Sequence, residues 1–137
     1  MREMRRCEWG CDDDRNGGAR LYCGHMPNHR DLAVLDAADL VADEVNRLIE
    51  ENPRRLIHVI QLRDSAQSIG ANISEGFGRG TTGERNRSLR TARGEAEEAI
   101  RHLRANLELK RIRATVFWRL SNRLITIVKM LTSLLNS

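Results

Sequence analysis

The chain has 137 residues, of which 23 are basic and 19 acidic, for a formal net charge of +4. A chain of this length can hold one domain with one core and bury roughly two-thirds of its unfolded surface, so a second folded domain is not expected. Because no apolar run approaches the roughly 20 residues of a membrane span, and no apolar segment follows the N-terminal arginines, we expect a soluble, cytoplasmic protein without a membrane partner.

Residues 1–29 differ in composition from the rest of the chain. They contain all three cysteines, three consecutive aspartates and few apolar residues, which predicts a disordered or loosely attached extension outside the folded domain. Thiolates and imidazoles are zinc ligands, but their spacing here is not that of a standard zinc module. We therefore expect no metal, no cofactor and reduced cysteines. The residues concerned are Cys7, Cys11, Cys23, His25 and His29.

Four amphipathic helices are predicted in residues 30–137. The first begins near Asp31 and should stop at Asn52, because Pro53 disfavours a helical residue before it. The second runs from about Arg54 to Glu75. The apolar residues step by four and three, as one face of a helix requires. They are Val34, Ala38, Val41, Val45 and Leu48 in the first helix, and Leu62, Ala66, Ile69 and Ile73 in the second.

The third helix opens near Thr82, with Thr81 or Thr82 as N-cap and Glu84 close by. Its connection to the fourth falls somewhere in residues 110–114. Four such helices with short connections, and no segment typical of a strand, predict an all-α fold, an antiparallel up-and-down four-helix bundle. The apolar stripes contain Leu89, Ala92, Ala96, Ala99 or Ile100, Leu103 and Leu107, and then Phe117, Leu120, Leu124, Ile127, Leu131 and Leu134.

Charge is distributed unevenly along these helices. Residues 30–51 carry seven acids and two bases, whereas residues 54–93 carry eight bases and three acids, and residues 101–137 carry eight bases and one acid. Only Lys110 and Lys129 among the basic residues are lysines, so the positive surface consists of guanidinium groups, which suit phosphate well. This asymmetry permits nucleic-acid binding, head-to-tail self-association, or both.

The arginines of the third helix follow the spacing of one helical face, away from its apolar stripe. One interpretation is a solvated face with the ordinary same-helix pairs Glu97–Arg101 and Arg104–Glu108. The other is contact with RNA or DNA, mainly through phosphate, because no base-reading motif is present. We name this face the arginine ridge: Arg87, Arg90, Gly94, Glu97, Arg101, Arg104 and Glu108. Arg79, Arg85, Lys110, Arg111 and Arg113 extend its charge at the two ends.

The sequence QLRDSAQSIGANISEGFGR at residues 61–79 resembles the signature of the four-helix-bundle proteins encoded within intervening sequences of large-subunit ribosomal RNA genes. A second block, Ala92-Arg93-Gly94 with Glu98, also resembles that family, as does Lys129-Met130-Leu131. The chain departs from the usual pattern at Asp64, Ser65, Gln67 and Gly70. The matches of the first block are Gln61, Leu62, Arg63, Ala66, Ser68, Ile69, Ala71, Asn72, Ile73, Glu75, Gly76 and Arg79.

That family includes the accessory proteins of diversity-generating retroelements. The resemblance therefore implies a homopentamer with a basic surface for nucleic acid, and it adds a reverse transcriptase to the candidate partners. Polar positions of the motif could line a site, or they could form a hydrogen-bonded network that fixes helix register, which we favour because a charge near a core must be paired. These positions are Arg63, Asn72, Glu75, Arg93 and Glu98.

An enzymatic function has the least support. Glu98 and His102 are four residues apart, whereas carboxylate-bridged metal bundles use Glu-x-x-His from two helices together with further glutamates. No nucleophile or phosphate loop stands out. The sequence thus predicts a non-catalytic, homo-oligomeric bundle that binds nucleic acid. The alternative is a self-assembling structural or protein-interaction module without nucleic acid.

Overall fold

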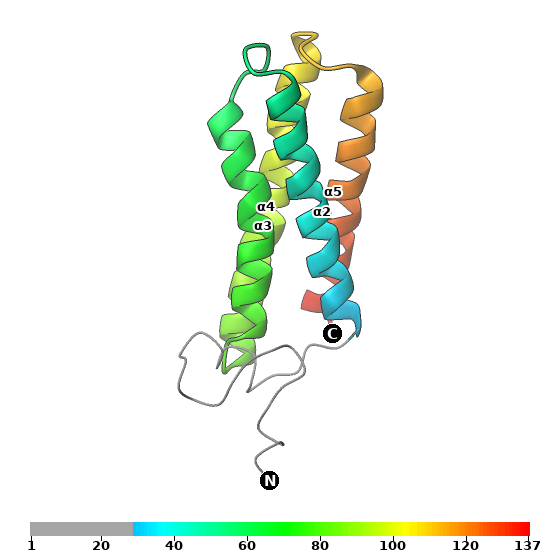
Figure 1. Cartoon of the computed structure of the whole chain (residues 1–137). Coiled ribbons are helices and arrows are strands. Elements are labelled where there is room, and N and C mark those ends of the chain that lie inside the picture. The colour runs from blue at the N-terminus through cyan, green and yellow to red at the C-terminus, as the bar shows by residue number, and fades with distance from the viewer. Residues whose placement is uncertain (1–28) are drawn as a thin grey trace.

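The computed structural model describes residues 29–137, and the predicted N-terminal extension and its cysteines lie outside the described residues, apart from His29 at the first helical position. Four helices follow one another: α2 (His29–Glu51), α3 (Val59–Phe77), α4 (Thr82–Glu108) and α5 (Ala114–Leu135). Their directions alternate, so that the connections 52–58 and 109–113 lie at the same end (Figure 1). The chain is an all-α, antiparallel four-helix bundle, as predicted.

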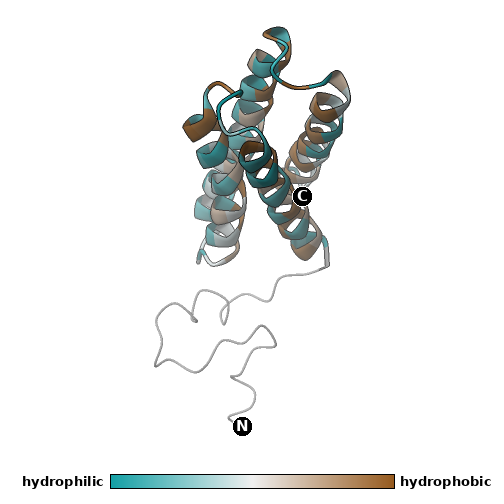
Figure 2. Ribbon diagram, turned by 45° about the horizontal axis from the view of Figure 1, so that its top comes forward, coloured by the Kyte–Doolittle hydropathy of each residue, from teal (hydrophilic) through white to brown (hydrophobic). Residues whose placement is uncertain are grey.

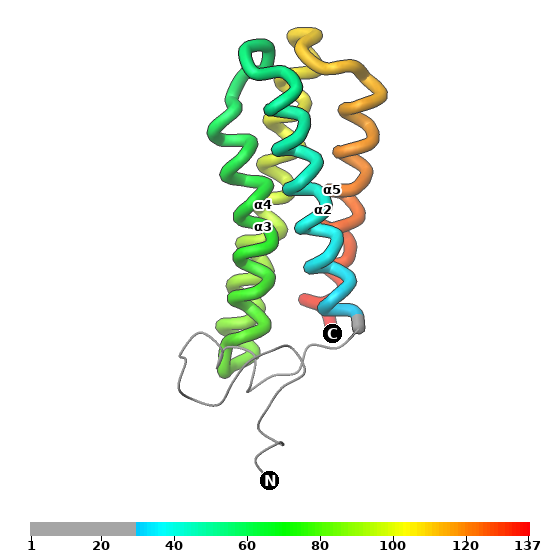
Figure 3. The backbone as a smooth tube through the Cα atoms, viewed as in Figure 1, coloured from blue at the N-terminus to red at the C-terminus, as the bar shows by residue number. Residues whose placement is uncertain are grey.

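Each helix packs on the next in sequence, and α2 closes the arrangement by packing on α5. The continuous tube in Figure 3 makes the alternating course of the chain easy to follow. Hydrophobic and hydrophilic residues alternate along the helices (Figure 2), as amphipathic helices around one core require. No helix in residues 29–137 combines the length and apolar character needed to cross a membrane.

The core agrees closely with the predicted apolar stripes. All six predicted residues of α5 are at most 4% exposed, and in α4 the ambiguous step falls on Ala99, which is fully buried, rather than on Ile100. In α2 the last buried position is Ile49, and Leu48 only packs against the core. The other predicted stripe residues that are fully or almost fully buried are Val34, Ala38, Val41, Val45, Leu62, Ala66, Ile69, Ile73, Leu89, Ala92, Ala96 and Leu103.

Most helix ends also match the sequence. The last residue of α2 is Glu51, just before Asn52-Pro53, and the Asn52 side chain donates to the Leu48 carbonyl at 2.9 Å. Thr81 is the N-cap of α4, and its hydroxyl accepts a 3.2 Å hydrogen bond from the Glu84 amide. Proline and capping residues act locally, so these positions can be recognised in the chain alone.

The start of α3 differs from the prediction. The helix begins at Val59 rather than near Arg54, and His58 adopts a left-handed backbone with φ 56°. Residues 52–58 instead form a connection whose backbone bonds to a side chain of α4, at Asn106. A tertiary contact therefore overrides the local pattern.

Candidate nucleic-acid interface

The arginine ridge lies along the outer face of α4. All seven of its residues are exposed, while the apolar stripe of the same helix is buried from Leu89 to Leu103, and Leu107 is partly buried against the core. The three-and-four spacing therefore predicts the orientation of this face correctly.

Arg101 pairs with a different acid from the one expected. Its guanidinium forms an ion pair with Glu98, one residue beyond Glu97. The second carboxylate oxygen of Glu98 lies 3.1 Å from Nε2 of His102, although not in hydrogen-bonding geometry. The Glu98 carboxylate is thus held between Arg101 and His102, which explains why the sequence spacing alone misassigns the pair.

Arg104 also lacks the predicted pair with Glu108. Its guanidinium carbon lies 5.9 Å from the centroid of the Phe117 ring on α5, a cation–π contact between neighbouring helices. Within residues 29–137, no carboxylate forms an ion pair with Arg87, Arg90 or Arg104. Three ridge arginines therefore carry positive charge that no acid of the described chain neutralises.

The two cations at the start of α4 are engaged locally. Arg79 pairs with Glu75, and its other terminal nitrogen lies 3.9 Å from Glu84. Arg85 donates a 3.0 Å hydrogen bond to the side-chain oxygen of Asn86. Arg85 is half-buried and shares the side of α4 that carries Leu89 and Ala92, so it does not belong to the ridge face. The charge of Arg79 and Arg85 is therefore less available to an outside anion than that of the unpaired arginines.

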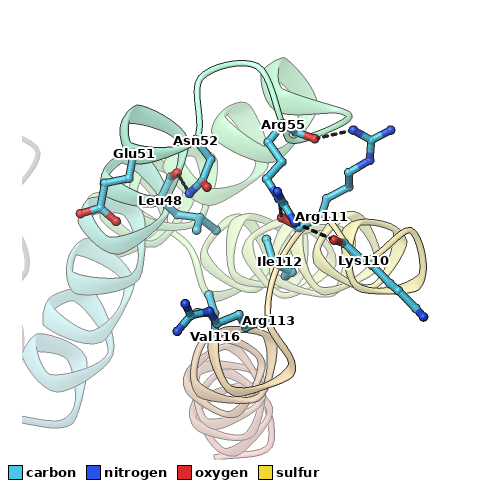
Figure 4. Close-up of a pocket in the computed structure, with 9 residues that line it drawn as sticks. All are labelled: Leu48, Glu51, Asn52, Arg55, Lys110, Arg111, Ile112, Arg113 and Val116. Atoms are coloured by element: carbon cyan, nitrogen blue, oxygen red, sulfur yellow. Dashed lines mark hydrogen bonds between the residues drawn. The ribbon is translucent and has the colours of Figure 1, made fainter.

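At the other end of α4, the predicted cations line a cleft of about 520 Å³ between the two loops. Arg55, which the charge pattern alone does not single out, joins them from the connection after α2. Glu51 is the one acid that lines the cleft, and its carboxylate points away from Arg55 (Figure 4). The lining residues are Leu48, Glu51, Asn52, Arg55, Lys110, Arg111, Ile112, Arg113 and Val116.

Reciprocal hydrogen bonds connect the two loops of this cleft. Arg55 donates from Nε to the Arg111 carbonyl at 2.9 Å and from Nη2 to the Lys110 carbonyl at 3.1 Å, and Arg111 donates back to the Arg55 carbonyl at 3.2 Å. Lys110 has a left-handed backbone with φ 57°. Figure 4 shows the side chains of Lys110, Arg111 and Arg113 diverging from one another. They spread positive charge over the bundle end rather than converging on one point.

Asn106 explains why Arg55 reaches this position. Its fully buried side-chain amide accepts a 2.8 Å hydrogen bond from the Ile57 amide and donates to the Ile57 carbonyl at 3.0 Å. It also donates to the His102 carbonyl at 2.9 Å. The connection after α2 is thereby fixed to α4, and Arg55 with it. An Arg-Arg pair directly after Pro53 was the available sequence signal, but the partner on α4 is about 50 residues away.

The five motif residues predicted to form a polar network occupy separate places. Asn72 donates to the Ser68 carbonyl of its own helix at 2.8 Å, and Glu75 pairs with Arg79. Arg93 connects two helices, by a 3.2 Å bond to the Thr132 hydroxyl on α5. Within residues 29–137 these contacts do not connect into one network. The remaining two residues are Arg63, which is half-buried, and Glu98, which pairs with Arg101.

The outer face of α2 carries the opposite charge. Asp36, Asp39, Asp43 and Glu50 are exposed there, together with Leu40 at 48% exposure, and we call this face the acidic stripe. Partial burial, and then the nearby Asp36 and Asp43, raise the pKa of Asp39. These carboxylates are therefore crowded as well as solvent-facing.

A polar groove between α3 and α4 contains further acids. Burial first, and then Glu98 and Asp64, raise the pKa of Glu95 in this groove. Residues 29–137 nevertheless contain no group of three or more His, Cys, Asp or Glu placed to hold a metal ion. The cysteine–histidine segment considered for zinc lies outside the described residues.

Four packed antiparallel helices with an arginine-rich outer face define this protein as an all-α bundle protein. Residues 30–133 match the sequence profile of the family described as 23S rRNA-intervening sequence protein, and the chain belongs to that family. The resemblance of the motifs at residues 61–79 and 92–98 is thereby confirmed.

A solved structure supports the same fold. It is a protein with unknown function from the S23 ribosomal protein family of Bacteroides thetaiotaomicron VPI-5482, with 24% sequence identity and a TM-score of 0.74. The match covers 79% of this chain and 99% of that chain. At this identity the likeness concerns the fold alone. No curated protein matches the chain.

Proposed function

We propose that this protein is a non-catalytic, homo-oligomeric bundle that binds nucleic acid through its arginine-rich surface. The observation that carries the proposal is the exposed ridge on α4, where Arg87, Arg90 and Arg104 have no acidic partner within residues 29–137. Guanidinium groups spaced along one helix can each meet a phosphate, and release of counterions then favours binding. The cations of the 109–113 loop continue this surface onto the bundle end.

Five subunits are the expected assembly, as the family resemblance implies. The acidic stripe on α2 of one copy is complementary in charge to the basic surface of another, and a heterologous contact of this kind closes into a ring when its rotation permits. RNA and DNA are both compatible with phosphate contacts. A reverse transcriptase is a further candidate partner, by resemblance to the retroelement accessory proteins.

The second candidate function is a self-assembling module without nucleic acid. The acidic stripe favours it, because Leu40 lies exposed among carboxylates that could occupy the arginines of a neighbouring subunit. In that case assembly would cover the ridge. The two functions therefore differ in whether the ridge stays accessible once the subunits have joined.

The test is a salt titration of binding to single-stranded RNA and DNA. Replacing Arg87, Arg90, Arg101 and Arg104 by Gln should weaken binding similarly for unrelated sequences and lower the salt slope by up to about one unit per lost contact. The fold should persist, since all four side chains are exposed.

A control variant with the same net charge removes four arginines from other positions: Arg20, Arg30, Arg47 and Arg54, each replaced by Gln. It should bind nearly as well as the parent protein. Equal losses in the two variants would show that net charge, rather than the ridge, determines binding. No binding by the parent protein at low salt would reject the nucleic-acid function and leave the self-assembling module.

A further inference from the structure

Trp118 on α5 is an exposed aromatic residue beside the arginine ridge. Its side chain is 54% exposed, although a tryptophan contributes most to stability when it is buried. It lies in the second turn of α5, next to Phe117, which is only 2% exposed. The Trp118 and Phe117 rings meet edge to face, with centroids 5.0 Å apart and an interplanar angle of 77°. A buried ring therefore supports the exposed one.

The same buried ring supports Arg104 of the ridge. The guanidinium carbon lies 5.9 Å from the Phe117 centroid, so Phe117 contacts one exposed planar group from α4 and another from α5. Trp118 and Arg104 therefore both contact the Phe117 ring, although they belong to different helices. Arg104 forms no ion pair within residues 29–137.

An indole and a guanidinium are both among the side-chain groups on which nucleobases stack. Stacking on an aromatic ring tolerates every base, because each has a π-face, and an adjacent arginine adds cation–π attraction and a contact to phosphate. A base within a duplex already stacks on its neighbours and cannot offer its face to a side chain. The pair therefore suits an unpaired base.

We propose that Trp118 and Arg104 form a stacking platform for an unpaired nucleobase, so that the preferred ligand of this surface is single-stranded. This inference rests on the proposed nucleic-acid function and adds the class of ligand and a residue, Trp118, that the ridge does not include. It gives the surface a contact with bases in addition to its contacts with phosphate.

The surroundings of Trp118 favour a base over a second protein copy. The next exposed apolar residue on α5 is Ile125, two turns away and 37% exposed, while the remaining large ones lie on other elements: Leu40, Ile60 and Leu109. A stable subunit interface has an apolar core of contiguous residues. A single exposed ring, with one arginine on the same supporting phenylalanine, is instead sufficient for one base.

The experiment compares three ligands with the same number of phosphates: a single-stranded oligonucleotide, an abasic strand and a duplex. The protein is the full chain with Trp9→Phe, so that Trp118 is the single tryptophan. Its fluorescence should be quenched by the natural strand and much less by the abasic strand. Trp118→Ala should weaken binding of the natural strand about tenfold, with the abasic affinity and the salt slope nearly unchanged.

Ile125→Ala is the matched control, because it removes an exposed apolar side chain from the same helix without touching the rings. It should change neither affinity nor quenching. Equal affinity for the natural and abasic strands would overturn the platform while leaving phosphate binding intact. A change of molecular mass in Trp118→Ala by light scattering would instead assign Trp118 to a subunit contact. Failure of every strand to bind would reject the proposed function and the platform together.

Discussion

The two ends of the bundle are stabilised in different ways. At one end, residues 78–81 connect α3 to α4, and the main interactions are local: Thr81 caps α4, and Arg79 pairs with Glu75 and approaches Glu84. At the other end, the connections 52–58 and 109–113 are held by hydrogen bonds between residues about 50 positions apart. A turn stabilised by local caps can be recognised in the sequence. A surface held by hydrogen bonds between distant residues exists only once the chain has folded.

The largest effect is expected from Asn106→Ala at the long-range end. The change leaves the amide and the carbonyl of Ile57 without their side-chain partners. Because unsatisfied buried polar groups are costly, we expect a loss of about 3 kcal/mol in the free energy of unfolding, measured by urea denaturation. Arg55 should also lose its fixed position.

Asn72→Ala is the matched control for this prediction. Its amide donates only to the Ser68 carbonyl of its own helix, so its removal should cost well under about 1 kcal/mol. If both variants were equally stable, the long-range hydrogen bonds would not be what holds this end together, and the contrast between the ends would fail.

A smaller loss is expected from Gly76→Ala, close to the local turn. A Cβ at Gly76 would lie 3.2 Å from the Arg85 carbonyl oxygen and 3.3 Å from Leu89 Cδ2. The backbone atom cannot move aside easily, so overpacking should outweigh the gain in helix propensity, with a net cost of about 1–2 kcal/mol.

Gly94→Ala is the same substitution at a helical position where the added Cβ has open space around it. No neighbouring heavy atom lies within 4 Å of the added Cβ, so the variant should be more stable by up to about 1 kcal/mol. Thermal unfolding of the two variants should therefore shift in opposite directions. A stabilising Gly76→Ala would mean that α3 and α4 can separate slightly at the turn.

Thr81→Ala should lower the free energy of unfolding by a still smaller amount. It removes the acceptor of the 3.2 Å bond from the Glu84 amide, at a cost of about 1 kcal/mol. In Thr91→Ala the lost hydroxyl bonds only the Arg87 carbonyl within α4, and better helix propensity should offset that loss. Chemical denaturation should separate the two. Equal denaturation midpoints for the two variants would indicate that packing near Gly76, rather than the Thr81 cap, stabilises this end of the bundle.

The smallest change in stability is expected from Asp39→Asn, on the acidic stripe between the two ends of the bundle. Its folded pKa is raised, so protonation favours the folded state and stability falls as pH rises through that pKa. Asp39→Asn replaces the ionisable carboxylate by a neutral amide and therefore removes this pH-dependent loss of stability. The variant should unfold at a slightly higher temperature than the parent at neutral pH, and the difference should shrink in acid. A lower melting temperature at neutral pH would show that the carboxylate has a favourable contact, such as one across a subunit interface.

The helices show how far sequence analysis reaches for this chain. The stripe from Phe117 to Leu134 predicts the buried face of α5 correctly, because the helical period fixes which residues share a side. The start of α3 was predicted too early, because Asn106 bonds the backbone of residue 57 and keeps the preceding segment out of the helix. Periodicity contains no information about such a partner.

The candidate interface likewise has features that the sequence predicts and features that depend on how the helices pack. The outward orientation of Arg87 and Arg90 follows from their spacing, but the contact of Arg104 with Phe117 depends on how α5 packs against α4. The exposure of Trp118 likewise depends on that packing. Spacing within one helix thus predicts a charged face, and it cannot predict which aromatic group of another helix lies beside it.

The sequence by itself determined the four helices, the apolar stripes, the uneven charge and the family motifs, because each depends on residues within a few turns of one another. The tertiary structure decided where Arg55 lies, which acid Arg101 meets and how Trp118 and Arg104 both come to contact the Phe117 ring. The physical reason is that side-chain contacts between helices depend on their relative rotation and separation, which are set by packing of the whole core.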